Sequence, residues 1–173
     1  MDTIFALASA PGKAGISIVR LSGPLAINVA EKLTKSKLKE KQPNLKVIYD
    51  SDNHFIDQAL ILIFRKPYSF TGENVVEFHL HGSSAVVSSV IKLLGNFKGL
   101  RSAEAGEFTR CALENGKIDL AQVEGLADLI DAETDAQHKQ AARIFNGALG
   151  EKTKEWRAKP VSYTHLTLPT TRL

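Results

Sequence analysis

Residues 69–82 have the sequence SFTGENVVEFHLHG, in which a loop rich in Ser, Thr and Gly leads into an alternating segment. Over Val75–Leu80, apolar side chains alternate with Glu77 and His79, which is typical of a strand with one face in a core. The earlier segment ISIVRL, residues 16–21, alternates in the same way and carries Arg20. These two segments predict strands, each with a charged side chain among apolar ones.

The segments around these two strands predict the rest of an α/β domain. Further strands are predicted at Leu45–Tyr49 and at Ala59–Phe64, the second of which is apolar throughout and therefore central in a sheet. Helices are predicted after Pro24, from Ser83 or Ser84 to Gly95, and over Glu104–Leu113. Residues 1–117 are therefore predicted to form a mixed sheet with flanking helices.

The remaining sequence has a different character. From Asp119 to Lys159 there is no proline, apolar residues recur at helical spacing, and Asp119 with Gln122 has the spacing of a capping box. Residues 118–160 are predicted to begin an all-α domain with one long helix. The last thirteen residues, VSYTHLTLPTTRL (161–173), resemble a translated sequencing adaptor and are predicted to be non-native. We therefore expect the natural protein to continue past Lys159.

Composition excludes several classes of protein. Of 173 residues, 43% are hydrophobic and 24% charged, and no run of about 18 apolar residues predicts a membrane span. One cysteine cannot form a disulfide framework, and the N-terminus lacks the pattern of a signal peptide, so a cytoplasmic location is expected. The net charge of +3 is concentrated in a lysine-rich stretch, residues 32–46, either a solvated surface or a phosphate-contacting patch.

Among candidate functional residues, Glu77 is the most informative. A carboxylate inside an apolar strand needs a partner, so Glu77 either pairs within the protein or accepts hydrogen bonds from a ligand. His79 and His81 lie two apart on the same strand, but a third metal ligand at suitable spacing is missing, so structural or ligand-facing roles are favoured. Cys111 is expected to be a small buried residue without a catalytic role.

Three segments together resemble the N-terminal part of the tRNA-modification GTPase family called MnmE or TrmE. They are PGKAGISIVRLSG (11–23), SFTGENVVEFHLHG (69–82) and GEFTRCALENGKIDLAQVEGLADLIDA (106–132). The resemblance implies modification of the wobble uridine of tRNA at carbon 5, together with a flavoprotein partner, MnmG or GidA. It also implies a GTPase domain that uses GTP, Mg and K, inserted into a helical domain.

For the N-terminal domain, the resemblance implies homodimerisation and binding of 5-formyl- or 5,10-methylene-tetrahydrofolate, the one-carbon donor. The positions that match the family's folate contacts are Arg20, Glu77 and Lys117. The family usually has a second glycine where Ser83 stands, and a proline where Ala105 stands. Since this chain lacks a Walker-type loop and a guanine-specificity motif, it is not expected to hydrolyse GTP by itself.

Two alternative hypotheses belong to other functional classes. In the first, which Ser83 favours, the chain is a purely structural dimerisation module with a degenerate folate site. In the second, it is a stand-alone folate enzyme similar to aminomethyltransferases. The leading hypothesis, a folate-binding and dimerisation module, depends on the three motifs and on a strand glutamate without an internal partner.

Overall fold

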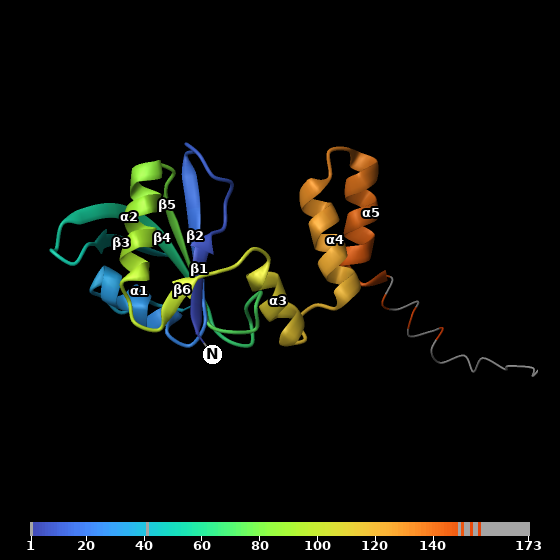
Figure 1. The fold of residues 1–173 in the computed structure, drawn as a ribbon, viewed down its shortest axis with the longest axis horizontal. Helices are drawn as coiled ribbons and strands as arrows, with labels where there is room; N and C mark the ends of the chain where they lie inside the picture. The colour runs from blue at the N-terminus through green and yellow to red at the C-terminus, as the bar shows by residue number, and fades with distance from the viewer. Residues whose placement is uncertain (1, 41, 149, 151–152, 154–155, 157–173) are drawn as a thin grey trace, which may run out of the picture. The chain divides into compact units, whose positions relative to one another are not determined.

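The computed structural model describes residues 2–40, 42–148, 150, 153 and 156. The chain divides into two compact units, one ending at Ile118 and one beginning at Asp119. In the first unit (Figure 1) the strands are β1 (Thr3–Leu7), β2 (Ile16–Ser22), β3 (Asn44–Tyr49), β4 (Phe55–Phe64), β5 (Val75–His81) and β6 (Leu100–Ser102). The helices are α1 (Ala26–Thr34), α2 (Ser84–Gly95) and α3 (Glu107–Glu114).

The strands form one mixed sheet in the order β3-β4-β5-β2-β1-β6. β1 and β6 pair in parallel, whereas the other neighbours are antiparallel. The predicted class, a mixed α/β sheet with flanking helices, is confirmed. β6 was not predicted, because three residues are too few to show a periodic pattern.

The two faces of the sheet have different surroundings. One face packs against α1 and α2, and its buried core includes Val19, Leu21, Val29, Leu33, Val76, Phe78, Leu80, Val90 and Leu94. Because successive strand residues point to opposite faces, Arg20, Glu77 and His79 lie on the other one, which we name the second face. The alternation seen in the sequence thus places the charged residues away from the core.

The second unit contains a pair of helices, α4 (Leu120–Asp131) and α5 (Asp135–Phe145). The prediction of one long helix was wrong, because Thr134 starts a new helix: its side chain accepts a hydrogen bond from the backbone N–H of Gln137 in a capping box. The predicted capping box of Asp119 and Gln122 is confirmed. The adaptor-like segment 161–173 lies outside the described residues.

None of the helices formed by the described residues is both long enough and apolar enough to cross a membrane.

Gly82, directly after β5, makes a close backbone contact with the loop that precedes β2. The Ala14 N–H donates to the Gly82 carbonyl at 3.1 Å, and the Gly82 N–H donates to the Gly15 carbonyl at 3.4 Å. A Cβ atom at position 82 would lie 2.2 Å from the Ala14 carbonyl oxygen. Only glycine fits here without moving the backbone.

α3 is fixed to the edge of the sheet by Glu107, whose side chain is only 4% exposed. Its carboxylate accepts hydrogen bonds from Arg101 of β6 at 2.6 and 2.9 Å, from Arg110 at 3.0 Å and from the Glu104 N–H at 2.8 Å. These donors, Arg101 above all, lower the pKa of Glu107 from 4.5 to about 2. The ion pair therefore sets the position of α3, which carries Phe108 toward the second face.

We predict that Gly82→Ala lowers the free energy of unfolding by about 2 kcal/mol, since the added methyl group forces the two backbones apart. Gly15→Ala is the matched control, because a Cβ at position 15 meets nothing within 4 Å. Urea denaturation of both variants checks this. Equal stability of the two would contradict the close contact.

We predict that Glu107→Gln lowers the free energy of unfolding at pH 7 by about 2 kcal/mol. A carboxyl group with a depressed pKa stabilises the fold above its unfolded pKa, and this contribution is lost as the pH falls through the folded value. The difference between wild type and variant should therefore narrow from about pH 4.5 toward pH 2. Denaturation curves across this range measure it, with the exposed Glu104→Gln as control; a constant difference would refute the prediction.

Candidate functional site

Arg20 and Glu77 form an ion pair at the centre of the second face. Arg20 on β2 and Glu77 on β5 are direct partners in the antiparallel register. The Arg20 Nε donates to Glu77 Oε1 at 2.9 Å, and Nη2 lies 2.7 Å from the same oxygen. Of the two predictions for Glu77, the structure thus shows pairing within the protein. The hypothesis that Glu77 has no internal partner was wrong.

Two aromatic side chains flank the Arg20 guanidinium. Its central carbon lies 5.7 Å from the ring centre of Phe70, in the loop between β4 and β5, and 5.6 Å from that of Phe108, on α3. Cation–π attraction to the two rings stabilises the position of the guanidinium. The Arg20 guanidinium thus contacts the Glu77 carboxylate and the rings of Phe70 and Phe108.

The second oxygen of Glu77 remains available. Both contacts from Arg20 go to Oε1, and among the described residues no group donates a hydrogen bond to Oε2. The nearest polar side-chain atom recorded beside Oε2 is Nε2 of His79, at 3.6 Å, which is beyond hydrogen-bond distance. The site therefore offers one carboxylate oxygen as an acceptor, next to an imidazole, on a partly covered surface.

Lys117 is connected to this pair through the loop of residues 65–74. Its Nζ donates to the Pro67 carbonyl at 2.9 Å, and neighbouring Asn115 donates to the Thr71 carbonyl at 2.7 Å. Gly72, at φ +78°, lies against both Asn115 and Lys117. The structure thus brings Arg20 and Glu77 into direct contact, whereas Lys117 holds the loop that carries Phe70.

The same loop is anchored to β2 by hydroxyl groups. The Ser22 and Thr71 side-chain oxygens lie 2.7 Å apart, and the Ser22 hydroxyl donates to Glu73 at 2.7 Å. Ser22 and Thr71 are both buried. The loop is therefore a fixed wall beside the ion pair.

Sequence reasoning found the ionic residues and missed the aromatic ones. Phe70 is one of two aromatic residues in the loop of residues 65–74, and an apolar ring at that position was the available signal. Phe108 could not be assigned to the second face, because this depends on how Glu107 docks α3. His79 was expected to have a structural or ligand-facing role, and it lies beside Glu77.

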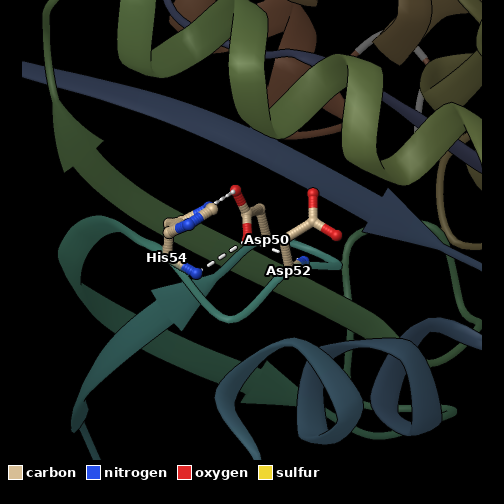
Figure 2. Close-up of side chains that lie close together, drawn as sticks. All are labelled: Asp50, Asp52 and His54. Atoms are coloured by element: carbon tan, nitrogen blue, oxygen red, sulfur yellow. Dashed lines mark hydrogen bonds and ion pairs between the residues drawn. The ribbon is translucent and has the colours of Figure 1, made fainter.

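A second group of potential ligands lies in the turn between β3 and β4. Figure 2 shows Asp50, Asp52 and His54, whose ligand atoms all lie within 4.8 Å of one another. Asp50 accepts hydrogen bonds from the Asp52 and His54 backbone N–H groups and lies 3.1 Å from His54 Nδ1. These bonds, led by the His54 N–H, lower the pKa of Asp50. They account for the cluster as the closure of a turn.

Two other candidates have structural explanations. Partial burial is the main cause that raises the pKa of the Cys111 thiol, so Cys111 is a poor nucleophile. In the lysine-rich stretch, Lys37 pairs with Glu31, and the Lys35 ammonium lies 4.5 Å from the ring centre of Tyr49. Both observations favour the solvated-surface alternative for this stretch.

Apolar side chains gather on the second face near the β3 edge of the sheet. Leu45 and Leu60 are cross-strand partners that are 61% and 37% exposed, and Phe64 on the same face is 37% exposed. We name these three residues the apolar strip. A groove of about 590 Å³ that includes Phe64 continues from it toward Leu62 and Tyr68.

Comparison of the sequence with known proteins identifies a family. The family model described as "GTP-binding protein TrmE N-terminus" matches residues 3–117. The proteins named "tRNA modification GTPase MnmE" from Roseobacter denitrificans and Ruegeria pomeroyi are 59% and 55% identical to this chain, each over 159 residues. The one from Phenylobacterium zucineum is 47% identical over 156 residues.

These matches cover most of this chain and a minor part of each relative. They extend over 92% of the chain and 37% of the Roseobacter and Ruegeria proteins, and over 90% and 35% in the Phenylobacterium comparison. The chain therefore belongs to the TrmE N-terminal family.

Proposed function

We propose that this chain binds a reduced folate, 5-formyl- or 5,10-methylene-tetrahydrofolate, at the second face of its sheet. The observation that carries this proposal is the Glu77 carboxylate: Oε1 is bound by Arg20, and no group of the described residues donates a hydrogen bond to Oε2. The pterin ring presents adjacent N–H donors that an ionised carboxylate accepts strongly. Glu77 is the residue that meets the pterin.

The other two candidate residues have different tasks in this proposal. Arg20 is already held by Glu77, Phe70 and Phe108, so it fixes the direction of the carboxylate. Lys117 is exposed, and its single described hydrogen bond is to a backbone carbonyl, which leaves two ammonium hydrogens for a carboxylate of the folate tail. In this proposal Lys117 contacts both the folate tail and the Pro67 carbonyl of the loop.

We infer that folate binding by this chain serves the activity of a longer parent protein. Relatives that this chain matches over 37% of their length are named tRNA modification GTPases. We infer that the parent protein is a cytoplasmic enzyme that modifies the wobble uridine of tRNA at carbon 5, with the folate as one-carbon donor. GTP, Mg and K would serve its GTPase domain, and a flavoprotein of the MnmG type would be its partner.

We predict that 5-formyltetrahydrofolate binds the wild-type chain and that Glu77→Gln weakens binding at least tenfold, about 1.4 kcal/mol. Glutamine keeps the size of the side chain but removes the charge that accepts the pterin N–H groups. Isothermal titration calorimetry measures both, with Glu114→Gln, on the exposed surface of α3, as control. Absence of binding to the wild type, or equal binding to Glu77→Gln, would refute the proposal.

A second candidate function is dimerisation, for which the apolar strip is the supporting observation. Exposed Leu45 and Leu60 on the two outermost strands at this edge are suited to burial against a second copy of the chain. A purely structural module with a degenerate folate site would show this association and no response to folate.

We predict that the double variant Leu45→Lys/Leu60→Lys weakens self-association at least tenfold, because two ammonium groups would have to lose water in the interface. Sedimentation velocity over a concentration series measures this. Ile16→Lys is the control, since Ile16 is 61% exposed but lies outside the apolar strip. Unchanged association of the double variant would exclude the strip as the interface.

A further inference from the structure

His79 carries a polar atom whose environment is incomplete. Its Nε2 is buried, and it is the one buried side-chain nitrogen or oxygen of the described residues that has no hydrogen-bond partner. A buried polar atom without a hydrogen-bond partner destabilises the fold, so such an atom in a folded protein calls for an explanation. The imidazole as a whole is 23% exposed, so it lies at the boundary between the sheet and the surrounding solvent.

The neighbours of His79 offer little other hydrogen bonding. Its cross-strand partners are Ile18 on β2 and Leu60 on β4, both apolar. The charged group that faces it is Glu77, two residues away on the same side of β5, with Oε2 at 3.6 Å from Nε2. A negative carboxylate favours the tautomer in which Nε2 carries the hydrogen, so Nε2 is a donor that points toward the region of Oε2.

Together the two atoms form a specific recognition pair. Among the described residues Oε2 has no hydrogen-bond donor and Nε2 has no hydrogen-bond partner, and at 3.6 Å the two atoms are too far apart to bond to each other. The complementary group has a donor and an acceptor on adjacent atoms, which describes a cis-amide, –NH–C(=O)–, in a ring. Such an edge would form two parallel hydrogen bonds with Glu77 and His79.

We propose that Glu77 and His79 jointly bind the lactam edge of a pyrimidinone ring, with Oε2 accepting the ring N3–H and Nε2–H donating to the carbonyl oxygen at C4. This inference rests on the proposed folate site and adds a residue and a specificity to it. His79 distinguishes a 4-oxo ring from a 4-amino ring, whose amino group cannot accept the Nε2 hydrogen. Rotation of the imidazole about its terminal torsion, which has broad preferences, brings Nε2 to the ligand.

The test compares two ligands that differ only at C4: 5-formyltetrahydrofolate and its 4-amino-4-deoxy analogue. Calorimetry gives a dissociation constant for each with the full chain. Replacement of His79 by Leu should shift the ratio of the two constants about tenfold toward the 4-amino ligand. The ratio is informative because protonation of the 4-amino ring affects its binding to wild type and variant alike.

Variants with matched shapes separate ligand recognition from a structural effect. His79→Gln keeps an N–H donor and should retain most of the wild-type ratio, whereas His79→Leu and His79→Met lack a donor and should both lose it. His54→Leu, in the exposed turn between β3 and β4, should leave the ratio unchanged. Circular dichroism verifies the fold, and His79→Met replaces His79→Leu if the latter does not fold.

The outcomes distinguish this inference from the proposed function. If the wild type binds neither ligand, both are overturned. If 5-formyltetrahydrofolate binds and Glu77→Gln weakens it, but the ratio is the same in wild type and His79→Leu, the folate site stands and the role of His79 is refuted. The inference is supported if the ratio of the two dissociation constants shifts in His79→Leu and stays close to the wild-type value in His79→Gln.

Discussion

The second face of the sheet depends on the pairing of Arg20 with Glu77. Each of these charges would be costly on a partly buried strand without the other, and the register of β2 against β5 places them directly opposite. Phe70, in the loop before β5, and Phe108, on α3, both lie close to the guanidinium. The ion pair thus lies where β2, β5, this loop and α3 meet.

The parts of the fold with strong periodicity could be predicted from sequence. β2 and β5 alternate so regularly that both their extent and the face of Arg20 and Glu77 follow from the residues. β6 has three residues, and the break between α4 and α5 depends on Thr134, a cap that also occurs as an ordinary surface residue. The local sequence pattern carries too little information to predict β6 or this break, because strand pairing decides the first and a single capping hydrogen bond decides the second.

The charged residues of the candidate site could be predicted from the sequence, but their contacts with one another could not. A carboxylate in an apolar strand indicates a need for a partner, but sequence alone cannot say whether that partner is an arginine or a ligand. The structure shows an arginine at Oε1, and among the described residues no group donates a hydrogen bond to Oε2. Lys117 has a different relation to the pair, since it holds the Pro67 carbonyl of the neighbouring loop.

The position of β1 has a consequence for biosynthesis. Thr3–Leu7 is made first, yet it pairs with β2 on one side and with β6, the last strand of the sheet, on the other. Until residues 100–102 have left the ribosome, one edge of this earliest strand has no backbone partner. A nascent chain therefore exposes an apolar strand edge for most of the translation of the first unit, a period in which a chaperone that covers extended segments would protect it.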